Sequence, residues 1–308
     1  MINIVGRRYL YFAISLVVII PGMVGLLAWG LPLAIDFTGG SLLELRFPGG
    51  QVPQPADVVA LYEAAGVPDA LVQTVGDTDL AVRSKTLDEE TKALILANLE
   101  DRYKGPITVL RFESVGPSIG SEVAQRAAGA VGLATFGILA YITYAFRGVT
   151  HAARYGMAAV IAMLHDVAVV LGVEALLGHF LGWEVDSLFL TALLTVIGFS
   201  VHDTIVVFDR IRENQRVLRR LDYETIVNHS IVQTLARSIN TQLTVMLTLL
   251  ALLLFGGGTT RHFVTILLIG VFSGTYSSIF NAAPILVVWE NREWRRWFRA
   301  KPARGYPA

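Results

Sequence analysis

Six ionisable side chains lie within long apolar stretches of the sequence, where a charge is costly and usually functional. They are His165, Asp166, Glu174, His202, Asp203 and Arg237. Asp203 lies about 6 residues, roughly 9 Å, before the expected inner end of its helix near Asp209. Arg237 lies about 6 residues after the expected inner start of the next helix near Ile231, so the two are expected to meet. A small movement changes the proton affinity of a carboxylate paired with a guanidinium in a low-dielectric interior. The pair therefore predicts a proton relay, with a static packing pair as the alternative.

Asp166 lies about 11 residues into its stretch, near the membrane centre, and is expected to be protonated or capped by His165 or by a neighbouring helix. It joins the predicted proton pathway, as does His202 beside Asp203. Both histidines also fit ordinary hydrogen-bonded packing, and neither has metal-ligand spacing. Glu174 lies near the outer end of its stretch, where we expect water to solvate it.

The elements that hold these groups are predicted to be six transmembrane helices. Hydrophobic residues make up 54% of the 308 residues and charged residues only 16%, with a mean hydropathy of +0.56. Each apolar run reaches the roughly 20 residues needed to cross a bilayer. The runs are 9–30, 123–146, 155–181, 187–208, 235–255 and 263–289.

Several functional classes are excluded or disfavoured by composition. The 25 basic and 25 acidic residues cancel, which argues against a general nucleic-acid binder. The chain has no cysteine, so it has no disulfide, iron–sulfur cluster or thiolate zinc site. A phosphate-binding loop of the Gly-x-x-x-x-Gly-Lys type is also missing. We expect no enzyme activity, no metal and no cofactor other than protons as coupling ion.

The distribution of Lys and Arg predicts that both termini are cytoplasmic. With this orientation 15 of the 25 basic residues lie in inner segments, whereas the short outer loops offer only Arg261. The expected organisation is a cytoplasmic N-terminus with helix one (1–35), an extracytoplasmic α+β domain (36–121), helices two to six (122–290) and a basic cytoplasmic tail (291–308).

The insertion between helices one and two has the pattern of a small soluble domain. Its signals read strand at 41–47, helix at 55–65, strands at 71–75 and 79–83, helix at 87–103 and strand at 108–115. Thr86 with Glu89 three residues later predicts a capping box for the second helix. This βαββαβ order predicts a ferredoxin-like fold.

Helix six contains small residues spaced four apart, a pattern that lets two membrane helices approach closely. These helix-packing residues are Gly270, Gly274, Ser278 and Ala282. Asn281 and Pro284 add a polar group and a helix irregularity in the same region.

Five ordered motifs closely resemble the SecF family of bacterial protein-export proteins. The first holds Asp36, Phe37, Thr38, Gly39 and Gly40 within 35–40 (IDFTGG), and the second holds Gly116 and Pro117 within 115–120 (VGPSIG). The third, 201–214 (VHDTIVVFDRIREN), includes Asp209 and Arg210. The last two are 234–241 (TLARSINT) and 274–283 (GTYSSIFNAA).

The resemblance implies a half-transporter of the resistance-nodulation-division superfamily in the bacterial inner membrane. Such a protein works with SecD and the SecYEG channel, using the proton-motive force to promote export of a preprotein across the lipid bilayer. By motif position its proton-pathway residues are Asp203 and Arg237, and His202 replaces the family's usual Asn. Two alternatives stay open: a stand-alone transporter of small molecules or lipids, and a non-transporting assembly factor.

Overall fold

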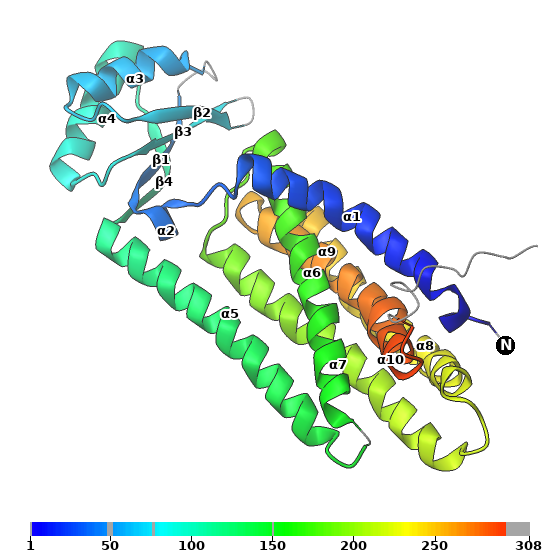
Figure 1. Cartoon of the computed structure of the whole chain (residues 1–308). Coiled ribbons are helices and arrows are strands. Elements are labelled where there is room, and N and C mark those ends of the chain that lie inside the picture. Colours follow the sequence, from blue (N-terminus) through cyan, green and yellow to red (C-terminus); the bar gives the residue numbers. More distant parts are fainter. Residues whose placement is uncertain (1, 48–51, 76–77, 150, 294–308) are drawn as a thin grey trace, which may run out of the picture. The chain divides into compact units, whose positions relative to one another are not determined.

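A computed structural model describes residues 2–47, 52–75, 78–149 and 151–293 of the chain. The chain divides into two compact units, one formed by residues 33–129 and the other by residues 1–32 together with 130–308. Most of the expected basic tail, residues 294–308, lies outside the described residues. The helices and strands are drawn in Figure 1.

Within the described residues, six helical segments are long and apolar enough to cross a membrane, as the sequence predicts. A short 3₁₀ turn (Val5–Arg7) precedes the first. The helices are α1 (Arg8–Trp29), α5 (Pro117–Ala145), α6 (Ala152–Leu181), α7 (Ser187–Val217), α8 (Tyr223–Phe255) and the segment formed by α9 (Gly258–Ser277) and α10 (Ala283–Glu290).

The last two helices are joined by a π-helical turn, Ser278–Ala282. Pro284 follows this turn and has no backbone N–H, so it cannot donate to the carbonyl four residues earlier. The Asn281 side chain, which is buried, instead donates to Ser15 Oγ on α1 at 2.9 Å. The irregularity predicted from Asn281 and Pro284 is therefore this π turn, supported by a neighbouring helix.

Helices α7 and α8 extend well beyond their apolar runs. The basic segment that follows Asp209 is helical as far as Val217. Helix α8 begins at Tyr223, where the Asp222 side chain caps its first turn by accepting from Thr225 N at 2.9 Å. Ion pairs one turn apart, Arg212 with Asp209 and Arg210 with Glu213, stabilise the polar end of α7. An apolar run measures the membrane-buried length, whereas the helix continues beyond it.

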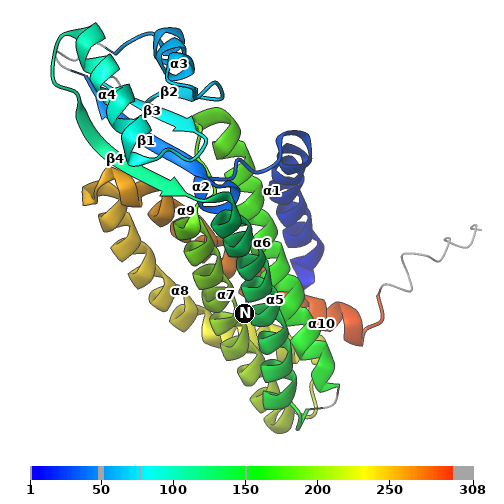
Figure 2. The same cartoon turned by 90° about the vertical axis from the view of Figure 1, so that its left-hand side faces the viewer.

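The second unit is a four-stranded antiparallel sheet with two helices on one face, as Figures 1 and 2 show. The strands lie in the order β2-β3-β1-β4. Its elements in chain order are α2 (Ile35–Thr38), β1 (Gly40–Arg46), α3 (Pro55–Ala64), β2 (Leu71–Val75), β3 (Asp79–Ser84), α4 (Glu89–Tyr103) and β4 (Thr108–Val115). Alternate residues Leu43, Leu45, Leu80 and Val82 point toward the helices and form the core with Ile95 and Leu99.

The predicted capping box of α4 is wrong by two residues. The helix starts at Glu89, and Asp88 Oδ1 accepts from Thr91 N at 2.7 Å. Hydrogen bonding from the side chain and then the backbone of Thr91 holds the pKa of Asp88 below its usual value. Thr86 Oγ1 instead donates to Val115 O on β4. Asp88 is an equally good N-cap, so two overlapping cap patterns competed for the same helix start.

The two glycine-containing motifs at either end of this unit pack against each other. Gly39 and Gly40 both have positive φ, at 74° and 124°. A Cβ on Gly39 would lie 2.7 Å from the Pro117 Cα, and one on Gly120 would lie 2.7 Å from the Gly39 N. Only glycine fits at Gly39, which combines this backbone conformation with such a close approach.

Close backbone contacts also set the helix packing of the first unit. Gly22 on α1 and Gly172 on α6 meet, and a Cβ on Gly172 would lie 2.8 Å from the Gly22 Cα. The small residues of α9 face α7: a Cβ on Gly270 would lie 2.1 Å from Val196 Cγ2, and one on Gly274 would lie 3.1 Å from the Ser200 Cα. Ser278 and Ala282, further along this stripe, are buried.

Ion pairs connect the start of α1 to the first turn of α8 and to the segment that follows α10. Arg8 forms a two-point ion pair with Glu293, with N–O distances of 2.5 and 3.1 Å, and a second ion pair with Glu224 at 2.9 Å. Tyr9 donates to Glu293 Oε2 at 2.6 Å. Burial opposes ionisation of Glu293, but the bonds from Arg8, Tyr9 and Asn291 outweigh it and lower the pKa of this carboxyl group.

We predict that Gly172→Leu destabilises the helical bundle by about 1–3 kcal/mol, because the added side chain separates α1 from α6. Gly137→Leu on α5 is the matched control, since a Cβ there has no atom within 4 Å. Thermal unfolding of the detergent-solubilised chain measures both. Equal melting temperatures for the two variants would contradict the close α1–α6 contact.

We predict that Glu293→Gln lowers the melting temperature at pH 7, and that the difference from wild type shrinks as the pH falls below about 4.3. Because folding lowers the pKa of Glu293, its carboxylate stabilises the fold at pH values above its pKa in the unfolded chain. This stabilisation is lost when the carboxylate is protonated at lower pH. Glu290→Gln, which removes an exposed partner of Arg154, serves as control. A pH-independent difference would argue against the ionic contact.

Candidate functional site: buried carboxyl groups in the helical bundle

Asp166 is completely buried and is surrounded by hydrogen-bond donors. The hydroxyl groups of Ser200, Ser273 and Ser277 each donate to its carboxyl oxygens at 2.6 Å. His165 Nδ1 lies 2.9 Å from Oδ1. The expected cap by His165 and a neighbouring helix is present, and two helices, α7 and α9, contribute to it. Asp166 therefore links α6 to both neighbours.

A second layer of hydroxyl groups lies next to Asp166. Thr204 and Ser278 are hydrogen-bonded at 2.8 Å. Both hydroxyl groups also lie within hydrogen-bond distance of the carbonyl oxygen of Ser200, so one donates to that oxygen while the other donates within the pair. Ser278 belongs to the π turn. The π turn therefore contacts α7 at Ser200, the residue whose side chain bonds to Asp166 of α6. The Asp166 cluster and the π turn are thus one connected polar network.

Asp203 lies one turn further along α7 and is 2% exposed. Its Oδ2 accepts from Gln242 Nε2 on α8 at 2.8 Å. Within the described residues no ion pair joins it to Arg237, so the expected direct contact is wrong. The true neighbour lies five residues further along α8, about 7.5 Å of helix, because the ends of apolar runs do not fix the register between two helices.

Two polar atoms beside Asp203 have no hydrogen-bond partner in the described part of the chain. They are Ser238 Oγ and Gln242 Oε1, both buried. Gln242 also borders a hollow of about 350 Å³ on the α7–α8 face, together with His202 and Thr241. His202 is exposed and does not bond to Asp203. The surroundings of this carboxyl group are polar but incompletely satisfied.

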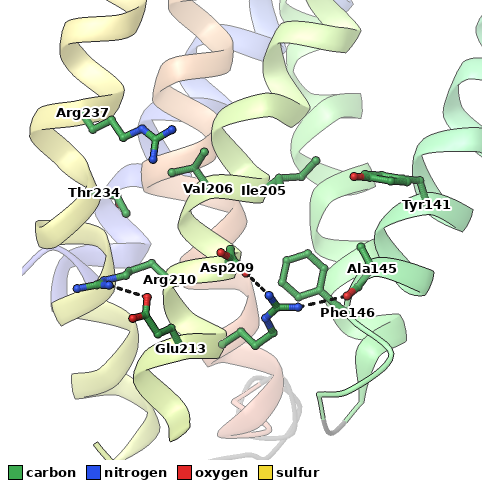
Figure 3. A pocket seen from close by; sticks show the side chains of 11 residues that line it. Tyr141, Ala145, Phe146, Ile205, Val206, Asp209, Arg210, Glu213, Thr234 and Arg237 are labelled. Atoms are coloured by element: carbon green, nitrogen blue, oxygen red, sulfur yellow. Dashed lines mark hydrogen bonds and ion pairs between the residues drawn. The ribbon is translucent and has the colours of Figure 1, made fainter. Parts of the chain in front are cut away.

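Arg237 is exposed on α8 and borders a pocket of about 480 Å³ formed by α5, α7 and α8. Figure 3 shows its side chain extending from α8 toward α7, where Val206 lies, with Thr234 below it on the same helix. Asp209 and Arg210, which belong to the matched motif of α7, line the same pocket. An intramembrane guanidinium therefore lies at a surface, without an ion-pair partner in the described residues.

Glu174 is not solvated as expected but completely buried. His262 Nε2 on α9 lies 2.9 Å from its Oε2. The predicted solvation of Glu174 rested only on its distance from the end of α6, whereas neighbouring helices cover this turn of α6.

The serine and glutamine partners were missed by the sequence analysis. Ser273 and Ser277 are spaced i, i+4, which places both on one face of α9, and this spacing was the available signal. Gln242 follows directly after a recognised motif. Within the described residues no three His, Asp or Glu side chains gather as a metal site requires.

Comparisons with known proteins agree with the sequence motifs. The model of the family "Protein export membrane protein SecD/SecF, C-terminal" matches residues 95–292, and that of the SecD/SecF GG motif matches residues 27–47. SecF from Anaerolinea thermophila is 58% identical, covering 98% of this chain and 99% of its own. SecF from Thermobaculum terrenum is 50% identical, covering 97% of both chains.

Solved structures show the same relationship. A crystal structure of SecDF, a translocon-associated membrane protein from Thermus thermophilus, is 36% identical with a TM-score of 0.81 and covers 94% of this chain. SecDF in a "super-membrane-facing form" gives a TM-score of 0.68 at the same identity and covers 96% of this chain. The chain spans 39% and 40% of these two longer proteins, respectively. It is a multi-pass membrane protein that belongs to the SecF family of protein translocase subunits.

Proposed function

We propose that this chain uses the proton-motive force, together with a SecD partner, to promote export of preproteins through the SecYEG channel. The observation that carries the proposal is the environment of Asp203. Its buried carboxyl group bonds to Gln242 on α8, and Gln242 and Ser238 on that helix each have a buried polar atom without a partner in the described residues. The exposed guanidinium of Arg237 lies on the same helix. Groups that are costly in a membrane and not satisfied within one chain are typical of an ion pathway.

The exposed face of α7 and α8 supports a partner half. Arg237, His202 and Asn240 are all exposed on this face. Polar side chains at membrane depth require another protein surface or a wet cavity rather than lipid. The related SecDF protein of Thermus thermophilus, of which this chain spans 35%, supports SecD as the occupant of this face.

Asp203 would accept the proton, with Arg237 acting on it through charge rather than contact. Asp166 would be a second member of the pathway, because Ser200 and Thr204 lie on the α7 turns that adjoin both carboxyl groups. The cage of hydroxyl groups around Asp166 connects to the π turn through the bond between Ser278 and Ser200. A change in the Asp166 hydrogen bonds would therefore shift the π turn and the helices α9 and α10 that it joins. Protons are the only coupling species this proposal needs.

The orientation and the soluble unit complete the proposal. Both termini would be cytoplasmic in the bacterial inner membrane, as the basic segments favour. The α+β unit would be an extracytoplasmic ferredoxin-like domain, supported by its strand order and the two helices on one face. It would contact SecD or the emerging preprotein.

We predict that Asp203→Asn and Arg237→Met each reduce export of a signal-bearing reporter by at least about tenfold, since each removes one half of the charge coupling. Cells lacking the native protein are complemented at matched membrane abundance, with and without a protonophore. Glu122→Gln and Arg261→Met, exposed groups away from the cluster, are the matched controls. Normal export by both test variants would favour a non-transporting assembly factor.

We predict that Asp166→Asn folds normally but exports at least about tenfold less, because the amide keeps an acceptor for the serines but cannot hold an exchangeable acid proton. Ser273→Ala removes a single donor from the cage and is expected to have a smaller effect. Membrane abundance, melting temperature and reporter export are measured together. Wild-type export by Asp166→Asn would limit this residue to packing.

A further inference from the structure

A buried carboxyl group besides Asp166 and Asp203 lies at the far end of the bundle from Arg8 and Glu293. Glu174 on α6 has no exposed surface, and its Oε1 has no hydrogen-bond partner in the described residues. Its Oε2 contacts one group, the Nε2 of His262 near the start of α9, at 2.9 Å. Neither the Asp203 nor the Asp166 cluster includes this pair.

His262 connects the buried carboxyl group to the protein surface. Its side chain keeps 19% of its exposure, whereas that of Glu174 keeps none. Trp183 and Phe189 flank the imidazole, with ring centroids 4.7 and 6.2 Å away. The aromatic rings fix the orientation of the imidazole and leave it as the polar contact between Glu174 and the outside.

The other charged groups at this end do not compensate Glu174. His179, on the same helix, stacks on Trp29 of α1 at 4.0 Å. Asp186 caps α7 by accepting from Phe189 N, and Glu184 precedes it in the loop. Arg261 is exposed beside His262 on α9. No Lys or Arg nitrogen of the described residues lies within 4 Å of Glu174, so His262 is its one titratable partner there.

The geometry favours states in which this pair holds a proton. An ionised Glu174 beside a neutral imidazole leaves the anionic Oε1 without a donor in an interior of low dielectric constant. A proton on the carboxyl group removes that charge, and a second ring proton on His262 balances it. Imidazole exchanges protons readily near neutral pH.

We propose that Glu174 and His262 form a proton-exchange site between water at this end of the bundle and the interior. His262 takes a proton from hydronium at its second ring nitrogen and passes the Nε2 proton to Glu174 Oε2. The imidazole is again neutral, the carboxylate has become a carboxylic acid, and water is released. The site deepens the proposed function and rests on it for its role in export, but its existence is tested separately.

The direct test is nitrogen NMR of the full chain in nanodiscs with ¹⁵N-labelled histidine, titrated from pH 5 to pH 9. Six histidines give the signals, and His262→Gln identifies the relevant one. We expect the midpoint of the His262 titration to move by about one pH unit or more in Glu174→Gln, as for two ionisable groups in contact. The signal of His179 is the internal control and stays unchanged.

An identical His262 midpoint in wild type and Glu174→Gln would overturn the proposal and leave the pair as a packing contact between α6 and α9. Glu174→Asp guards against a folding defect, because it keeps the acid; normal His165 and His179 signals confirm that each variant is folded. With both controls normal, either result decides the question.

Export at external pH 6 and pH 8 tests the use of the site. We expect export by wild type and by Arg261→Gln to differ between the two pH values, and export by Glu174→Gln and His262→Gln to be the same at both. Unchanged pH dependence in both test variants would exclude a role in export. The Asp203→Asn result is separate: if that variant exports normally, the proposed function fails, while the histidine titration still decides whether the exchange site exists.

Discussion

Every polar group inside the bundle must find its partner within protein, because lipid offers none. This constraint explains the arrangement around Asp166, where three serine hydroxyls and one imidazole from three helices meet at one carboxyl group. It also explains why the small residues of α9 matter: Gly270 and Gly274 bring α9 close enough to α7 for Ser277 and Ser200 to share that carboxyl group. Packing and polar satisfaction are therefore one requirement in this molecule.

The same constraint distinguishes the three carboxyl groups that are buried within the described apolar helices, Asp166, Asp203 and Glu174. In the part of the chain that the structure describes, three serine hydroxyls and His165 contact Asp166, whereas Asp203 has one hydrogen-bond donor and Glu174 one histidine. On α8, Ser238 and Gln242 have buried polar atoms without a partner in the described residues, whereas Arg237 is exposed. The SecD partner proposed above would complete these groups.

Sequence patterns identified the helices, the strands and the costly charges, because hydrophobic length and period depend only on local residues. They failed wherever the answer depended on how two helices align. Asp203 meets Gln242 rather than Arg237, and Glu174 is covered by neighbours instead of by water. The serine cage escaped notice because a serine gives no hydropathy signal, and its role appears only when α6, α7 and α9 are brought together.

The central claim is that Asp203 carries a proton through the membrane. The most direct measurement is proton entry into liposomes that contain the chain with SecD, followed by a pH-sensitive dye under an imposed membrane potential. The account predicts entry with wild type and its loss with Asp203→Asn at equal reconstitution. Equal proton entry for the two proteins would contradict it.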